Sequence, residues 1–254
     1  MTNEVTTEIR DRVMIITLNR PDAMNAVNQA LSNELAAALD QLDNEASVSV
    51  GVLTGNGRGF CAGMDLKEYV STGLPTVPGR GFGGIVEKGS RKPLISAVEG
   101  FALAGGLELA LGTDLIVAAK GAKFGIPEVS VGLFAAAGAL LRLPRALPYA
   151  RAMKMALTAE PMLAEEAYQF GLVAELCEKG EALNTAIDLA NRIAKNAPLG
   201  LIASKELVRE MQGRTEAEFW EFQATQVEQV FNSADGKEGA TAFAEKRAPN
   251  WTGS

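Results

Sequence analysis

Two glutamates are the strongest candidates for acid–base chemistry in this sequence. Glu108 lies within the apolar run 107–111, and Glu128 follows Pro127, 20 residues further along the chain. A carboxylate in an apolar pocket resists ionisation, so its pKa rises. Two carboxylates at one pocket can take different pKa values, and one then serves as an acid and the other as a base. Spacing alone leaves open that both are unrelated structural carboxylates.

The chain of 254 residues contains no histidine and only two cysteines, Cys61 and Cys177. Hydrolases that depend on Ser-His-Asp or Cys-His arrangements are therefore excluded, because both need an imidazole base. Zinc sites built on His or on Cys alone are excluded as well, and we expect no metal site. A general base must be Asp, Glu, Lys or Tyr, or a cysteine with a perturbed pKa.

Two glycine-rich segments can present free backbone N–H groups. Residues 59–68 (GFCAGMDLKE) follow the apolar run 48–54, and residues 99–110 (EGFALAGGLELA) follow the apolar run 94–98. Each pattern predicts a strand, a glycine turn and a helix start, where the first N–H groups have no partner within the helix. Geometry alone favours a plain strand-to-helix connection, with Gly63 as the turn residue.

A sheet must hold these segments in place. The alternation of short strands and helices up to about residue 120 predicts an α/β fold with largely parallel pairing. After about residue 145 the pattern becomes helical, and we divide the chain into a core, 1–195, and a C-terminal helical region, 196–254. Residues 71–89 are rich in Gly and Pro and predict a mobile surface loop. The predicted strands are 5–10, 13–18, 48–54, 94–98 and 114–119, and the predicted helices include 31–42 (capped by Asn28), 104–111, 183–194, 199–211, 215–231 and 238–245.

The charge balance limits the partners of the chain. The formal net charge is −7, so we expect neither a nucleic acid nor an anionic membrane as a partner. No stretch reaches the ~18 apolar residues that suggest a membrane span. The polar N-terminal segment does not resemble a signal peptide and cysteines are few, which favours a cytoplasmic protein. An anionic ligand would need a few local cations or helix N-termini.

Five segments together resemble the enoyl-CoA hydratase/isomerase (crotonase) superfamily. They are 19–26 (NRPDAMNA), 60–67 (FCAGMDLK), 100–110 (GFALAGGLELA), 124–132 (FGIPEVSVG) and 238–247 (EGATAFAEKR). The resemblance covers nearly the whole chain, in order. It implies a crotonase-like α/β core, a repeated ββα spiral, with a C-terminal α-helical trimerisation region that also contacts CoA. It also implies a homotrimer or a homohexamer made of two trimers.

The resemblance also implies a reaction. The backbone N–H groups of Met64 and Gly105 would hold the oxyanion that forms on an acyl-CoA thioester, and Glu108 and Glu128 would flank the substrate double bond. The expected activity is enoyl-CoA hydratase, the syn addition of water across a trans-2-enoyl-CoA to give a 3-hydroxyacyl-CoA. No cofactor is implied beyond the coenzyme A part of the substrate.

Nine further positions match CoA contacts of the family. The basic candidates for the phosphates are Arg58, Lys67 and Lys246, and the tail residue can come from a neighbouring subunit. For Lys67 and Lys246 an ordinary solvated surface role stays open. The nine positions are Met24, Ala26, Arg58, Ala62, Asp65, Leu66, Lys67, Phe243 and Lys246.

One segment departs from the pattern of many hydratases. Residues 134–142 (FAAAGALLR) carry alanines where those enzymes have glycines, and each added methyl disfavours a positive φ. This departure and the 71–89 segment suggest a bulky acyl group. Enoyl-CoA isomerase and carnitinyl-CoA dehydratase-like activity are alternatives, and a non-catalytic acyl-CoA-binding or interaction protein is an alternative of another class. The histidine-dependent dehalogenase branch is excluded.

Overall fold

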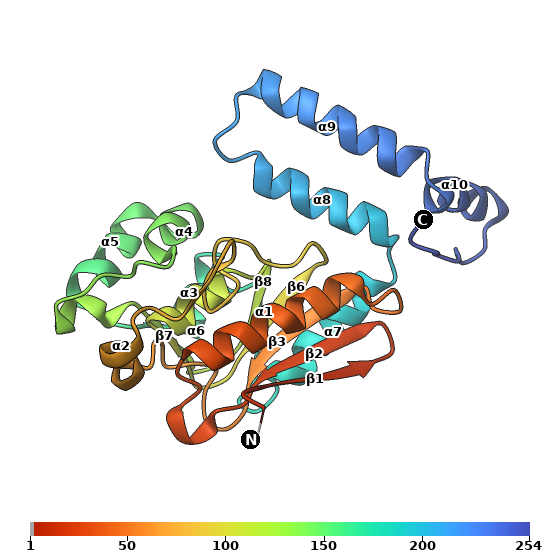
Figure 1. The fold of residues 1–254 in the computed structure, drawn as a ribbon. Helices are drawn as coiled ribbons and strands as arrows, with labels where there is room; N and C mark the ends of the chain where they lie inside the picture. The colour runs from red at the N-terminus through yellow and green to blue at the C-terminus, as the bar shows by residue number, and fades with distance from the viewer. Residues whose placement is uncertain (1–2) are drawn as a thin grey trace.

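The computed structural model describes residues 3–254, and its largest element is a six-stranded sheet (Figure 1). The strand order is β1-β2-β3-β6-β8-β11, and every neighbouring pair is parallel except the β1–β2 hairpin. The predicted parallel α/β fold is therefore confirmed. The strands are β1 (Val5–Arg10), β2 (Val13–Leu18), β3 (Val50–Gly55), β6 (Leu94–Val98), β8 (Leu115–Ala119) and β11 (Glu175–Cys177).

Both faces of this sheet are covered. On β3, Val50 and Val52 pack with the alanine face of α7 (Ala182–Ala194), while Leu53 belongs to the core on the opposite face. This alternation follows from the two-residue period of a strand. The opposite face is covered by α1 (Gln29–Asn44), which the Asn28 side chain caps by accepting a hydrogen bond from Leu31 N at 2.9 Å. The predicted cap is confirmed.

A second, three-stranded sheet gives the fold its repeat. It contains β10 (Met162–Leu163), β9 (Lys123–Gly125) and β7 (Phe101–Leu103), with β7 and β9 parallel. The chain leaves β6, turns at Gly100 (φ +61°), forms β7 and enters α3 (Gly105–Leu111). It then leaves β8, forms β9 and enters the 3₁₀ helix η2 (Pro127–Val131). Each unit is strand, strand, helix, as the expected ββα spiral requires.

The remaining short elements surround the second sheet and the glycine turns. The strands of two or three residues were not predicted, because such runs are too short to show a hydrophobic period. These elements are η1 (Pro21–Ala23), α2 (Leu66–Thr72), β4 (Thr76–Val77), β5 (Gly81–Phe82), α4 (Ala139–Ala146), α5 (Tyr149–Thr158) and α6 (Ala164–Gln169).

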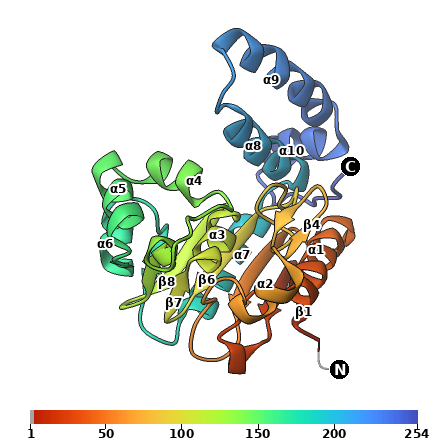
Figure 2. The same cartoon turned by 60° about the vertical axis from the view of Figure 1, so that its left-hand side comes forward.

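Three C-terminal helices stand apart from the core. Both views show α8 (Pro198–Glu210), α9 (Glu216–Phe231) and α10 (Ala234–Glu245) extending beyond the sheets (Figures 1 and 2). Gln226 is the one buried residue of α9, whereas Trp220 and Phe231 are exposed. The division expected at residue 195 falls between α7 and α8. Within the described range 3–254, no helix combines the length and apolar character that crossing a membrane requires.

The expectation of a surface loop at 71–89 is wrong for its second half. Phe82, Ile85 and Val86 are buried in the core, and Arg80 is buried as well. Gly83 and Gly84 have positive φ and lie so close to neighbouring atoms that a Cβ on either would stand within 3 Å of them. The glycines therefore serve tight packing rather than mobility, and the three apolar residues anchor the segment.

Candidate active site

The first candidate oxyanion donor is Met64, just after the glycine turn at Gly63. The turn is fixed on both sides: Cys61 pairs with Ala102 of β7, and Gly63 O accepts a hydrogen bond from Val27 N at 2.7 Å. Gly63 has φ +113°, a conformation that favours glycine. Within residues 3–254 the Met64 N–H donates to no protein acceptor. It is therefore available to a ligand.

The second candidate donor is Gly105, the first residue of α3. Ala104, just before it, has φ 50° and ψ −131°, a backbone conformation that costs a non-glycine residue about 1–3 kcal/mol. Its own N–H donates to Gly125 O at 2.8 Å, which ties the strained residue to β9. Because ψ of Ala104 orients the next peptide, the strain directs the Gly105 N–H. That N–H also has no acceptor in the described part of the chain.

The two N–H groups border one small space. A methyl group built on Gly63 would lie 3.3 Å from Gly105 N, and one built on Gly105 would lie 3.6 Å from Met64 N. The same methyl on Gly105 would lie 2.6 Å from the Phe82 ring. Two fixed N–H donors at one point are the arrangement that stabilises a developing oxyanion.

Glu108 lies on α3 with 3% of its surface exposed. Its Oε1 accepts hydrogen bonds from Ala137 N at 2.7 Å and Ala139 N at 3.1 Å. Burial raises its pKa to about 7, the charge of Glu128 adds to the increase, and the two N–H groups and the Arg142 charge oppose it. A carboxyl group with this pKa can gain or lose a proton near neutral pH.

Glu128 lies on η2 and is half-buried. Its Oε2 is buried and has no hydrogen-bond partner among residues 3–254. Burial raises the pKa of this carboxyl, partly opposed by a hydrogen bond from its own backbone N–H. A buried oxygen without a protein partner normally binds water or a ligand.

The register of the small sheet explains why the two glutamates share a site. Leu103 of β7 pairs with Gly125 of β9, and Glu108 and Glu128 follow these residues by five and three positions. Parallel strands in register bring their following helices to the same edge of the sheet. Although 20 residues separate them in sequence, Glu128 lies close enough for its charge to raise the pKa of Glu108.

Comparison with known proteins agrees with this geometry. A family model described as enoyl-CoA hydratase/isomerase matches residues 8–254. This chain belongs to that family. The resemblance inferred from five short segments is confirmed over almost the full length.

Individual members of the enoyl-CoA hydratase/isomerase family are similar along the whole chain. Enoyl-CoA hydratase EchA19 of Mycobacterium tuberculosis is 41% identical, with 96% of this chain and 94% of that protein covered. Carnitinyl-CoA dehydratase of Proteus mirabilis is 36% identical, with 96% of each covered. The crystal structure of enoyl-CoA hydratase EchA1 from Mycobacterium marinum superposes with a TM-score of 0.97 at 52% identity, covering 100% of both chains. The expected fold class is confirmed.

The predicted CoA loop adjoins the first donor. Ala62 N donates to Met24 O at 3.0 Å, so residues 24–26 lie beside the glycine turn. Asp65 caps α2 by accepting from Glu68 N at 3.3 Å and pairs with Arg20 at 3.1 Å. Partial burial would raise the pKa of Asp65, but these hydrogen bonds hold it below its ordinary value. Its carboxylate is thus engaged within the protein.

Two residues that hold this loop were missed from the sequence. Asn25 is fully buried, and its Nδ2 donates to Asn56 O at 2.9 Å and to Phe60 O at 3.0 Å, which joins residues 24–26 to the segment that leads into the glycine turn. Asn25 has φ 56°, and asparagine tolerates this left-handed conformation in turns. Its residue type is therefore the signal in the sequence that could have identified it. Arg20 donates to Ala26 O as well as to Asp65. No local pattern connects Arg20 with a residue 45 positions away.

The remaining CoA candidates fall into two groups. Arg58, Leu66 and Lys67 are exposed near the glycine turn. Phe243 is 87% exposed on α10, and Lys246 is the C-terminal cap of that helix. Helix α10 lies away from α2 and α3 in both views (Figures 1 and 2). A single chain therefore does not bring these two residues to the glutamates.

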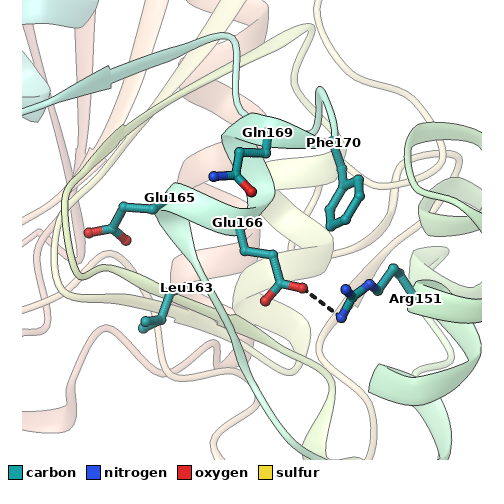
Figure 3. A pocket seen from close by; sticks show the side chains of 6 residues that line it. All are labelled: Arg151, Leu163, Glu165, Glu166, Gln169 and Phe170. Carbon is teal, nitrogen blue, oxygen red and sulfur yellow. Dashed lines mark ion pairs between the residues drawn. The ribbon is translucent and has the colours of Figure 1, made fainter.

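A separate pocket of about 400 Å³ is not part of this site. Figure 3 shows the Arg151–Glu166 ion pair (2.8 Å) with Phe170 beside it, while Glu165 points away. The arginine stacks on the Phe170 ring at 5.2 Å. These contacts satisfy the charges locally. No predicted site residue lines this pocket.

Proposed function

We propose that this protein is an enoyl-CoA hydratase that adds water to a trans-2-enoyl-CoA. The observation that carries the proposal is that two backbone N–H groups, at Met64 and Gly105, have no acceptor within residues 3–254, while Glu108 is buried and Glu128 has a buried oxygen without a partner in the same range. Family relatives named enoyl-CoA hydratase support it. The N–H groups can bind the thioester oxygen, and the glutamates can transfer the protons that hydration requires.

In the proposed reaction the thioester oxygen accepts hydrogen bonds from Met64 N and Gly105 N. Water lies between Glu108 and Glu128. One carboxylate takes a proton from this water while the water oxygen bonds to Cβ. The electron pair of the double bond then moves toward the thioester oxygen. The other carboxyl group then gives its proton to Cα, and the C=O bond re-forms. Both glutamates act on one face, so the addition is syn.

Substrate binding follows the same division of roles. Residues 24–26 and 62–67 would line the CoA moiety, with Arg58 and Lys67 near its phosphates. Phe243 and Lys246 would come from a neighbouring subunit of a homotrimer or a homohexamer of two trimers. The exposed Trp220 and Phe231 of α9 support such an assembly, since large apolar patches mark interfaces. The reaction requires no cofactor beyond the CoA of the substrate, and a cytoplasmic location remains part of the proposal.

A second candidate is the dehydration of a bulkier hydroxyacyl-CoA. A relative named carnitinyl-CoA dehydratase supports it, as do Ala135, Ala136 and Ala137 in the segment that holds Glu108. The same two glutamates serve both directions. An isomerase would need only one carboxylate, so the presence of both favours hydration or dehydration.

The deciding experiment follows the loss of enoyl absorbance with a panel of trans-2-enoyl-CoAs. Glu108→Gln and Glu128→Gln should each lower kcat by about 10²–10⁴-fold, the usual contribution of acid–base catalysis. Glu166→Gln, in the separate pocket, is the matched control and should keep wild-type activity.

Three outcomes would redirect the assignment. Full activity in both glutamine variants contradicts the two-carboxylate mechanism. Turnover of 3-enoyl-CoAs alone indicates an isomerase. Tight acyl-CoA binding without turnover of any substrate indicates the non-catalytic alternative.

A further inference from the structure

Arg142 is a buried cation that the proposed reaction does not use. It lies on α4, and its Nη1 is buried without a hydrogen-bond partner in the described chain. Burial lowers its pKa, and Arg209 and Arg145 lower it further. Keeping an incompletely paired charge beside two other cations is costly. Other contacts of Arg142 must therefore offset the cost of burying its charge.

The guanidinium of Arg142 lies directly over the loop that holds Glu108. A methyl group built on Gly138 would stand 2.4 Å from Arg142 Nη1. Gly138 has φ +102° and separates Ala137 from Ala139, the two residues whose N–H groups bind Glu108. Gly138 thus leaves room for the guanidinium against the backbone. The guanidinium group therefore packs against the backbone of this loop at Gly138.

The same guanidinium reaches the segment around the oxyanion donors. Its Nη2 donates to Val86 O, in the buried stretch that also contains Phe82. The Phe82 ring lies against Gly105. Arg142 therefore joins the carboxylate-holding loop to the segment that packs beside the second N–H donor.

We infer that Arg142 is a positioning residue that fixes the loop whose N–H groups hold Glu108. This inference rests on the proposed catalytic role of Glu108. The charged groups that act on Glu108 are Glu128, which disfavours its ionisation, and Arg142, which favours it. Arg142 in turn is repelled by Arg145 and Arg209 and attracted by Glu108. The N–H groups of Ala139 and Ala137 oppose the effect of burial on Glu108 most, and Arg142, packed against the loop that carries them, adds a smaller effect of the same sign.

The test is the pH dependence of kcat/KM for enoyl-CoA hydration. Arg142→Met should move the limb governed by Glu108 to higher pH, because the variant lacks a positive charge that favours the ionised carboxyl group. Arg142→Lys keeps the positive charge but lacks the planar guanidinium group that contacts both Gly138 and Val86. The Glu108 limb of its pH profile should therefore stay near that of the wild type, while kcat falls. Arg145→Met, which removes a neighbouring cation that does not act on Glu108, is the control and should leave the limb in place.

An unchanged limb in Arg142→Met would overturn the inference, as would equal shifts in the Lys and Met variants. If Arg142→Met does not fold, the Lys variant decides alone: a displaced limb contradicts the electrostatic role. Glu108→Gln separates the two proposals. If it retains full activity, the catalytic role of Glu108 fails; if it is inactive while Arg142→Met keeps its limb, only the role of Arg142 fails.

Discussion

The chemistry of Glu108 is set by its surroundings more than by its own side chain. Burial and the Glu128 charge raise its pKa, while Ala137 N, Ala139 N and Arg142 limit the rise. The result is about 7, so both protonation states are populated near neutral pH. This balance suits proton transfer but costs stability, because ionising a buried group opposes folding.

We therefore predict that Glu108→Gln is more stable than the wild type at pH 8 but not at pH 4. The folded-state pKa, about 7, lies above the ordinary value of 4.5. Between these values the unfolded chain loses its proton first, so the wild-type free energy of unfolding falls as pH rises through this window. The variant avoids this loss and should gain about 2–3 kcal/mol at pH 8.

Denaturant unfolding of both proteins at pH 4 and pH 8 checks this prediction. Glu166→Gln, whose carboxylate is partly exposed and ion-paired, serves as the control. A difference between Glu108→Gln and the wild type that is the same at both pH values would contradict the raised pKa.

At the scale of elements, the two N–H donors depend on glycine turns packed against each other. Gly63 has φ +113°, and a Cβ there would lie 2.7 Å from Ala104 Cβ and 3.1 Å from Leu103 O. The turn and the start of α3 cannot both keep their positions if a methyl is added. The donors would then separate.

Gly63→Ala should lower kcat by about 10²–10³-fold, the effect of losing one oxyanion donor. Gly73→Ala is a matched control, because Gly73 also has positive φ (+81°) but no atom within 4 Å of its Cβ position. Both variants bear backbone strain of about 1–3 kcal/mol, and Gly63→Ala adds about 1–3 kcal/mol of overpacking.

Steady-state kinetics and thermal unfolding of the two variants provide the measurement. Equal losses of activity in both would mean that backbone strain, and not the position of the Met64 and Gly105 N–H groups, determines the rate.

At the scale of the whole molecule, the proposed function places part of the site on a neighbouring chain. Phe243 and Lys246 lie on α10, which stands apart from the helices of the site (Figures 1 and 2). The exposed apolar residues of α9, Trp220 and Phe231, would be covered in the proposed assembly. A trimer would meet both requirements, and light scattering should give a mass of at least three chains.

Subunit mixing tests whether Lys246 serves a neighbour. Lys246→Glu should raise KM for the CoA substrate about fivefold, equivalent to roughly 1 kcal/mol. Mixed with the inactive Glu108→Gln chain, it should regain affinity, because some sites then combine an intact Glu108 with an intact neighbouring Lys246. A mixture of Glu108→Gln and Glu128→Gln is the control and should remain inactive, since both changes affect the same chain's site. Mixed activity equal to the average of the separate proteins would contradict a shared site.

The sequence by itself determined the longer strands, several of the helices and the list of candidate residues. Buried strands such as 94–98 and the capped helix after Asn28 show their hydrophobic period and their cap locally, so they could be predicted. The absence of histidine already restricted the general base to Asp, Glu, Lys, Tyr or a cysteine with a perturbed pKa. The family resemblance added the roles of Met64, Gly105, Glu108 and Glu128.

Only the tertiary structure decided how these residues act together. The register of β7 and β9, two strands too short to predict, places Glu108 and Glu128 at one edge. The strain at Ala104, the buried links of Asn25 and Arg20, and the contact of Arg142 with the Gly138 loop all join residues distant in sequence. Such contacts leave no local period, because their energies come from burial and charge in three dimensions. The same reason made residues 80–86 resemble a loop until packing showed them to be core.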